Sequence, residues 1–225
     1  MILAAVLRSS SRWVTALPGG PHLKTEIKRA LRALYPITRL RFIVNRSEYP
    51  HILNAMGLFG EGVEVGVQRA AFAEQILSTW RGTRLYCVDP WKAYPESDYR
   101  DLSNVSQTDQ DRNFAEARER LRRFGARAVI LRMESRQAAA LFQDRQLDFV
   151  YLDARHDYES VAADIRVWSP KIRPGGILSG HDYLNGLLAE GDFGVKRAVQ
   201  EFAKAFRLCV RTSYEAAWPS WFIQL

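Results

Sequence analysis

Five short apolar runs, each with an acidic residue at or just past its carboxyl end, constrain the fold of this chain more than any other feature. The runs are residues 63–65, 85–89, 129–134, 149–153 and 177–182, and their acids are Glu64, Asp89, Glu134, Asp153 and Asp182. Helical-looking stretches separate the runs, and this alternation predicts a parallel sheet. Ligands of such sheets bind in the crevice outside the carboxyl ends of the strands. Acids at that edge favour a ligand with hydroxyls, amines or a metal ion over a bare anion.

The apolar periodicity also predicts the remaining elements. We expect helices at residues 70–80, 110–124, 135–142, 158–168 and 194–206, and a turn at residues 174–176 before the fifth strand. Two final strand-like runs, residues 207–212 and 220–225, are joined by a short link, which is typical of a hairpin. The expected fold is therefore α/β: a Rossmann-like, doubly wound, mostly parallel sheet of seven strands with a C-terminal antiparallel strand.

The net charge of +7 lies entirely at the start of the chain, because residues 1–55 hold nine Lys and Arg against two acids and the remainder is neutral. The high isoelectric point therefore says little about the site and weakens an argument for a nucleic-acid partner. We expect a basic N-terminal helical extension at residues 1–58 and a cofactor-binding domain at residues 59–225.

Within the extension, apolar residues recur at helical spacing over residues 23–34. Such a stripe packs on the domain or on a second subunit, as in a homodimer, or lies on a membrane surface or against phosphates. No stretch approaches the roughly 20 apolar residues of a membrane span. Cys87 and Cys209 lack the spacing of a metal site and favour reduced thiols in a cytoplasmic protein.

The first three strand ends carry residues suited to a nucleoside cofactor. Gly66 follows Glu64 at the first strand-to-helix junction and allows a tight turn and a close approach of ligand to backbone. Asp89 ends the second strand about twenty residues later, where an acid can accept hydrogen bonds from ribose hydroxyls. Glu134 and Ser135, after the third strand, can meet an adenine amine. Taken singly, each of these residues is equally explained as a plain turn, a helix cap or a rim charge.

The fourth and fifth strand ends carry residues suited to chemistry. Asp153 and His156 follow one strand and His181 and Asp182 the next, and adjacent strands lie about 4.8 Å apart, so these ends can converge. Two carboxylates and an imidazole suit Mg²⁺ or Mn²⁺, which would hold the hydroxyls of a substrate. His156 is placed to take a proton as general base. Alternatively, His156 or Asp157 caps the next helix and His181 is a structural residue.

A long polar segment, residues 90–109, follows Asp89 and contains Trp91, Tyr94 and Tyr99. Connections of this length are usually functional lids or disordered. The aromatic side chains either cover the cofactor or a ring-shaped acceptor, or they pack against the sheet edge.

These motifs together resemble those of class I S-adenosylmethionine-dependent methyltransferases, and more narrowly the macrocin-type O-methyltransferases of the methyltransferase domain 24 group. The resemblance covers residues 60–206. It rests on the motifs Glu64-x-Gly66, Val88-Asp89-Pro90-Trp91, Asp153-x-x-His156-x-Tyr158, Pro174-Gly175-Gly176 and Gly180-His181-Asp182-Tyr183. One departure is Ala70, where the family usually has a second glycine, and a slightly altered turn that still binds the cofactor is expected there.

The resemblance implies a role for each motif residue. S-adenosylmethionine would contact the residues at the strand ends, with methionine near Gly66, ribose on Asp89 and adenine near Glu134 and Ser135. The full set implied for the cofactor is Glu64, Gly66, Asp89, Trp91, Glu134, Ser135 and Asp153.

For catalysis, the resemblance implies Asp153 and Asp182 as metal ligands, with Asp153 also counted as catalytic and His156 as the base. His181 stands at the position of a family acid that is often replaced, and it is a ligand, a donor to a ligand or a substrate contact.

Three functions are compatible with these residues. The first is O-methylation of a small hydroxylated acceptor: a sugar, a natural product or an aromatic compound. The second is methylation of RNA or DNA through the basic extension, which the sequence Asp153-Ala154-Arg155-His156 argues against, because amino-methylating enzymes commonly carry an Asn/Asp-Pro-Pro-aromatic motif there. The third is a non-catalytic module that binds S-adenosylmethionine, which intact Asp153 and His156 argue against.

Overall fold

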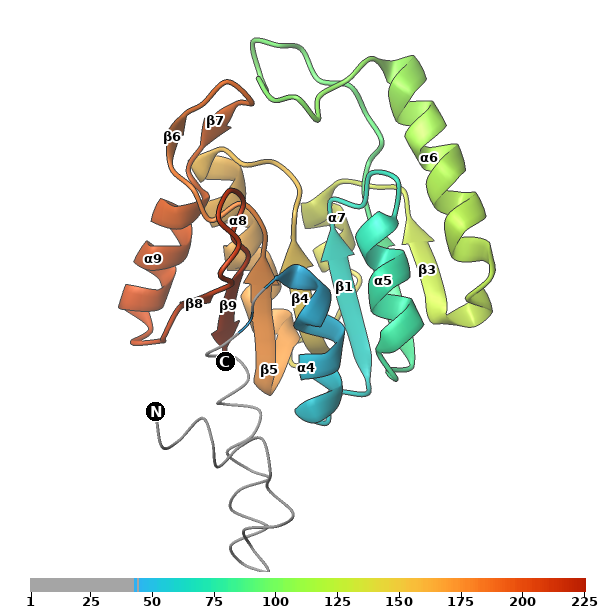
Figure 1. The fold of residues 1–225 in the computed structure, drawn as a ribbon, viewed down its shortest axis with the longest axis vertical. Helices are drawn as coiled ribbons and strands as arrows, with labels where there is room; N and C mark the ends of the chain where they lie inside the picture. The colour runs from blue at the N-terminus through green and yellow to red at the C-terminus, as the bar shows by residue number, and fades with distance from the viewer. Residues whose placement is uncertain (1–42, 44) are drawn as a thin grey trace, which may run out of the picture. The chain divides into compact units, whose positions relative to one another are not determined.

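A computed structural model describes residue 43 and residues 45–225, so the basic helix predicted over residues 23–34 lies outside the described part. A sheet of seven strands runs through the molecule in the order β3-β2-β1-β4-β5-β9-β8 (Figure 1). Strands β1 to β5 are parallel, and β9 is antiparallel to both β5 and β8. The predicted mostly parallel sheet with a C-terminal antiparallel strand is thereby confirmed. The strands are β1 (Glu61–Val65), β2 (Arg84–Val88), β3 (Ala128–Leu131), β4 (Leu147–Leu152), β5 (Ile172–Gly180), β8 (Arg211–Thr212) and β9 (Trp221–Gln224).

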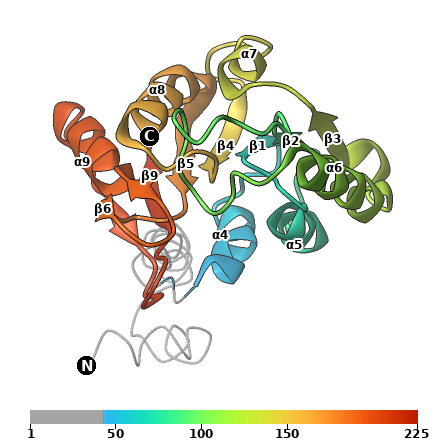
Figure 2. The ribbon, with the colours of Figure 1, turned by 90° about the horizontal axis from the view of Figure 1, so that it is seen from above.

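Helices cover both faces of the sheet, as a doubly wound fold requires. Seen from above, α4, α5 and α6 lie on one side of the sheet and α7, α8 and α9 on the other (Figure 2). No helix in the described part is long and apolar enough to cross a membrane. The helices are α4 (Tyr49–Ala55), α5 (Ala71–Thr79), α6 (Gln107–Arg122), α7 (Ser135–Ala139), α8 (Tyr158–Trp168) and α9 (Val195–Ala205), with short 3-10 helices η1 (Arg46–Glu48), η2 (Gly125–Arg127) and η3 (Ser169–Lys171).

Local sequence explains where the two helices nearest the site begin. The Asp157 carboxylate accepts a hydrogen bond from the Ser160 backbone N–H and caps α8, so the capping role considered for Asp157 is confirmed. The Ser106 hydroxyl accepts the Asp109 N–H in the same way, and α6 therefore begins three residues before the predicted start at residue 110.

The structure differs from the sequence-based expectation at two places near the fifth strand. Residues 174–176 lie inside β5 instead of forming a turn before it, because the strand begins at Ile172 and absorbs them where the register against β4 shifts. A two-stranded hairpin of β6 (Gly186–Leu187) and β7 (Asp192–Phe193) was not predicted. Strands of two residues are too short to show an alternating pattern.

The compact unit that contains the sheet runs from Phe42 to Leu225, and thus includes residues assigned above to the extension. Tyr49 in α4 is fully buried, and its ring lies 5.5 Å from that of Tyr151 and 5.4 Å from that of Phe222. The Ser179 hydroxyl donates to the Tyr49 hydroxyl at 2.8 Å, which fixes α4 to β5. Residues 45–58 therefore pack as part of this unit. A separate extension stays a prediction for the residues before them.

Candidate active site

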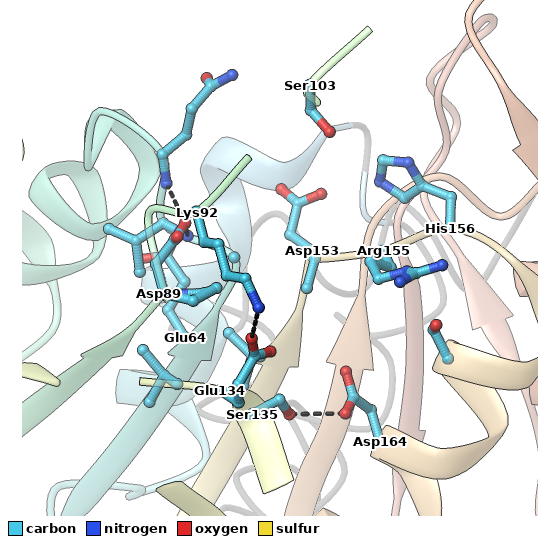
Figure 3. Close-up of a pocket in the computed structure, with 18 of the residues that line it drawn as sticks. Glu64, Asp89, Lys92, Ser103, Glu134, Ser135, Asp153, Arg155, His156 and Asp164 are labelled. Atoms are coloured by element: carbon cyan, nitrogen blue, oxygen red, sulfur yellow. Dashed lines mark hydrogen bonds and ion pairs between the residues drawn. The ribbon is translucent and has the colours of Figure 1, made fainter. Parts of the chain in front are cut away.

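A cavity of about 900 Å³ lies at the carboxyl ends of the parallel strands, where the acids were predicted to gather. Figure 3 shows Glu64 of β1, side chains from the connections after β2, β3 and β4, Ser135 of α7 and Asp164 of α8 around one space. Seven of the predicted site residues line the cavity: Glu64, Gly66, Asp89, Glu134, Ser135, Asp153 and His156. Below, the β2–β3 end of the site means Asp89, Glu134 and Ser135, and the β4–β5 end means Asp153, His156, His181 and Asp182. His181 and Asp182 do not line the cavity themselves but lie against Asp153 and His156.

Gly66 brings the first strand-to-helix turn against the end of β4. Its φ is 86°, and a Cβ atom there would lie 2.0 Å from the backbone oxygen of Asp153. Only glycine fits such a close approach at a positive φ. Ala70, at the family's second glycine position, also has a left-handed φ of 60°, which explains why glycine is usual there.

Asp89 braces this turn through its backbone. Its Oδ2 accepts the N–H groups of Val67 and Gln68, both at 2.9 Å, and its Oδ1 accepts the Trp91 N–H at 2.7 Å. Burial raises the pKa of Asp89 above its ordinary value, although these three donors oppose the shift. A ribose hydroxyl bound to Asp89 would share the carboxylate with the turn.

Trp91 supports the same turn without lining the cavity. The ring is fully buried 4.8 Å from Phe114, and its indole N–H donates to the Gln68 carbonyl at 2.7 Å. The structure therefore places this predicted cofactor residue behind the turn, where it can act on a ligand only indirectly, through Gln68 and Asp89.

Glu134 and Ser135 are each held by residues that the sequence reading did not single out as site residues. The Tyr94 hydroxyl donates to both Glu134 oxygens, at 2.9 and 3.0 Å. The Ser135 hydroxyl donates to Asp164 at 2.6 Å. Asp164 lines the cavity from inside α8, and burial raises its pKa to about 6. A single acid within an amphipathic helix has no local signal that separates it from a surface residue.

At the β4–β5 end, three possible metal donors converge. The His181 Nδ1 lies 2.8 Å from the Asp182 Oδ1 and 3.8 Å from the Asp153 Oδ1. One donor atom from each residue falls within 4.8 Å of the others. Burial raises the pKa of Asp153. Burial opposes ionisation of Asp182 too, but contacts with His156 and His181 outweigh it and lower its pKa.

His156 stands between two carboxylates. Its Nδ1 lies 2.8 Å from the Asp101 Oδ2, and its ring stacks on Phe193 at 5.0 Å. Its Nε2 is 3.0 Å from the Asp182 Oδ2, yet it has no partner in hydrogen-bond geometry among the described residues. Burial disfavours the charged ring, but the two carboxylates outweigh burial and raise the pKa of His156 to about 10. In this arrangement the imidazole carries a proton at neutral pH.

Asp101 and Arg46 are site residues that sequence reasoning missed. Asp101 lies in the segment after Asp89, in which only the aromatic residues were predicted to contact a ligand. Arg46, in η1, lines the cavity and donates to the Asp153 Oδ2 at 3.2 Å. From sequence it was one of nine basic residues near the start of the chain, with nothing to set it apart.

Arg155 holds the segment after Asp89 over the site. Its Nη2 donates to the Asp98 carbonyl at 2.6 Å, and its guanidinium lies 4.5 Å from the centre of the Tyr99 ring. Asn104 braces the segment internally by donating to the carbonyls of Tyr94 and Tyr99. The segment is therefore ordered over the cavity: Tyr94 and Tyr99 line the cavity, whereas Trp91 is buried behind the turn.

Comparison with known proteins identifies the family of this fold. A family model described as a methyltransferase domain matches residues 62–183, which include all four residues of the β4–β5 end. No curated protein sequence matches the chain.

Solved structures share the fold at low sequence identity. A candidate rRNA methylase from Clostridium thermocellum superposes with a TM-score of 0.55 at 13% identity, covering 79% of this chain and 95% of its own. A candidate O-methyltransferase from Klebsiella pneumoniae superposes with a TM-score of 0.54 at 16% identity, and the match covers 95% of this chain and 94% of its own. The cofactor-bound protein Rv0187 from MTB superposes with a TM-score of 0.54 at 15% identity, and the match covers 92% of this chain and 98% of its own. At these identities the similarity establishes the fold and leaves the acceptor open.

Proposed function

Because this chain belongs to the family of methyltransferase domains, and so is an S-adenosylmethionine-dependent methyltransferase, we propose that it methylates a hydroxyl oxygen of a small acceptor. The acceptor class is a sugar, a natural product or an aromatic compound. The observation that carries this proposal is that Asp153 and His156 line one end of the cavity, with Asp182 3.0 Å from the His156 Nε2. These are side chains that can bind hydroxyls and accept their protons.

The cavity fits the cofactor. A volume of about 900 Å³ is at the upper part of the roughly 300–1,000 Å³ range of ligand pockets, which allows for a nucleoside and an acceptor together. Glu64 is buried, and its Oε2 has no hydrogen-bond partner among the described residues. A buried carboxylate oxygen of this kind is suited to the positive charges of the cofactor. S-adenosylmethionine supplies a methyl group on a positively charged sulfur.

We propose that His156 first releases its own Nε2 proton and then receives the proton of the acceptor hydroxyl on that nitrogen. The ring is charged while Asp101 and Asp182 flank it, so it becomes a base when the contact between Nε2 and Asp182 is broken. Asp101 holds Nδ1 and so fixes the orientation of the ring. Asp182 now faces Nε2, and the acceptor hydroxyl would have to take the place of this contact before the proton can move. Alignment of the hydroxyl oxygen with the methyl group would then supply most of the rate enhancement.

The donor set at the β4–β5 end also fits a divalent metal ion, with Asp153, His181 and Asp182 as ligands. Mg²⁺ or Mn²⁺ bound there would hold adjacent acceptor hydroxyls and lower the pKa of the reacting one. We expect excess EDTA to abolish methyl transfer and added Mg²⁺ or Mn²⁺ to restore it. Unchanged turnover in EDTA would remove the ion from the mechanism.

A direct search for the acceptor tests the function. The protein is incubated with a metabolite extract and S-adenosylmethionine carrying an isotopically labelled methyl group, and products are detected by mass spectrometry. We expect label in a hydroxylated small molecule, and none when His156→Ala replaces the wild type. Label only in amines or in macromolecules would refute O-methylation of a small acceptor.

RNA methylation is the second candidate, because the candidate rRNA methylase shares the fold and the first 55 residues carry the whole excess of positive charge. Total RNA added to the same incubation discriminates between the two. Label that precipitates with RNA, together with RNA binding that weakens steeply with salt, would favour this alternative.

A further inference from the structure

Arg46 reaches the cavity from outside the segment that matches the family model, which begins at residue 62. It opens η1, and the Asn45 side chain fixes this turn by accepting the Ser47 N–H at 2.9 Å. Its guanidinium lies 5.0 Å from the centre of the Phe72 ring and donates to the Asp153 Oδ2 at 3.2 Å. Tyr49 is fully buried, and its ring lies 6.5 Å from that of Phe72, so Arg46 is held in place by packing and by charge.

Arg46 and Glu64 place a guanidinium and a carboxyl group on the lining of the same cavity. Burial raises the pKa of Glu64 well above its ordinary value, and the charge of Arg46 opposes that shift. Burial also disfavours the charged form of Arg46, but the charges around it, those of Asp153 and Glu64 among them, outweigh burial. The two side chains are therefore close enough to interact. The Glu64 Oε2 has no hydrogen-bond partner among the described residues. The guanidinium has five N–H donors, of which one contacts Asp153 and another the Tyr151 hydroxyl. A ligand with one ammonium and one carboxylate on the same carbon complements both groups.

The cofactor presents this combination at its methionine end, since its α-carbon carries an ammonium and a carboxylate. We infer that Arg46 binds the α-carboxylate of S-adenosylmethionine, while Glu64 accepts from the α-ammonium. This inference rests on the proposed function, that is, on the use of this cofactor. A guanidinium matches a carboxylate with two parallel N–H donors, a geometry that a lysine cannot reproduce. Through Asp153, the same side chain would link the cofactor to the acceptor end of the site.

Calorimetry with two ligands tests the inference without any acceptor. Decarboxylated S-adenosylmethionine lacks the α-carboxylate and keeps the amine, the sulfonium and the nucleoside. We expect Arg46→Met to weaken binding of S-adenosylmethionine by about 10- to 100-fold, the size of a lost charge-assisted contact, and to leave binding of the decarboxylated ligand within about 2-fold. Arg46→Lys should fall between wild type and Arg46→Met for the first ligand only.

Arg84→Met is the matched control, because Arg84 also contacts a carboxylate at 3.2 Å, that of Glu61, but at the opposite end of its strand. It should change neither affinity. Equal losses for both ligands in Arg46→Met, or no loss, would overturn the inference, because Arg46 would then act on Asp153 and Glu64 alone.

Two further results distinguish a failure of this inference from a failure of the proposed function. A wild type that binds neither ligand would overturn the proposed function and this inference together. If Arg46→Met does not fold, which a thermal melt reveals, Arg46→Lys supplies the test by the same comparison of the two ligands.

Discussion

At the β2–β3 end of the cavity, Asp89 accepts three backbone N–H groups, whereas at the β4–β5 end Asp153 and Asp182 contact the charged side chains Arg46 and His156. Backbone donors belong to the fold and keep their position whatever binds. Side-chain cations can move, exchange partners or give up a proton. The difference indicates that the first end is built for a ligand of constant shape, and the second for groups whose charge changes during a reaction.

Removing His156 should give the largest effect and separate the two ends most clearly. We expect His156→Ala to lower the rate of methyl transfer by about 100- to 10,000-fold, because the proton acceptor is lost. Affinity for S-adenosylmethionine should stay within about 3-fold of wild type by calorimetry. His51→Ala, on the exposed face of α4, is the control. Normal turnover by His156→Ala would show that another group takes the proton.

Gly66→Ala should damage the β2–β3 end and the neighbouring end of β4 together. The new Cβ would lie 2.0 Å from the Asp153 carbonyl oxygen at a φ of 86°, so the turn has to move. We expect cofactor affinity to fall at least about 10-fold, with a loss of unfolding free energy of about 3 kcal/mol, from calorimetry and chemical denaturation.

Gly57→Ala is the control for that substitution. Gly57 has a similar φ of 72°, but no atom lies within 4 Å of its Cβ position. It should cost only the backbone strain, about 1 kcal/mol, and leave cofactor affinity unchanged. If both variants bind the cofactor equally well, the close approach at Gly66 does not matter for binding.

Asp164 differs from Asp89 because its hydrogen-bond partner is a side chain, the Ser135 hydroxyl, and not the backbone. Its ionisation should make the stability of the protein depend on pH. Burial raises its pKa from 3.8 to about 6, while Arg136 opposes the shift and Asp157 and Glu134 add to it. Below pH 3.8 Asp164 is protonated in both the folded and the unfolded protein, and the raised pKa costs almost no stability. Above about pH 6 it must ionise in the folded protein too, and the full cost applies.

Asp164→Asn removes that penalty and keeps an acceptor for Ser135. The variant should therefore gain stability relative to wild type as pH rises from 4 to 7, by up to about 3 kcal/mol. Urea denaturation at several pH values measures the gain. A stability difference that stays constant across this range would contradict a raised pKa.

Tyr94→Phe should give the smallest effect. It removes the hydroxyl that donates to Glu134 and leaves the ring, which packs beside Arg155. Because Glu134 is partly exposed and also lies near Lys92, we expect cofactor affinity to fall only about 2- to 5-fold. A loss as large as that of Gly66→Ala would mean that the covering segment contributes as much to binding as the turn does.

The residues predicted from sequence are those that a strand end places directly. Asp89, Glu134 and Asp153 each follow an apolar run, and parallel strands bring such ends to one edge, so local pattern was enough. Asp101 and Arg46 were missed because they meet their partners across 55 and 107 residues of chain. Neither lies in a periodic element, so only the folded chain brings them to the site.

His156 shows a different limit. Its place beside the site followed from its distance of three residues from Asp153, but its state of protonation depends on Asp101 and Asp182, which belong to other elements. For Trp91 the sequence motif predicted a contact with the cofactor, but the folded chain places its ring in the interior behind the turn.

The anchoring of α4 has a practical consequence for shortened versions of this protein. A chain cut at the start of the family match would lack Tyr49, and the rings of Phe149, Tyr151 and Phe222 would lose the neighbour that shields them. Exposed aromatic surface of this kind promotes aggregation. An expression clone intended for crystals or assays should therefore start upstream of Asn45.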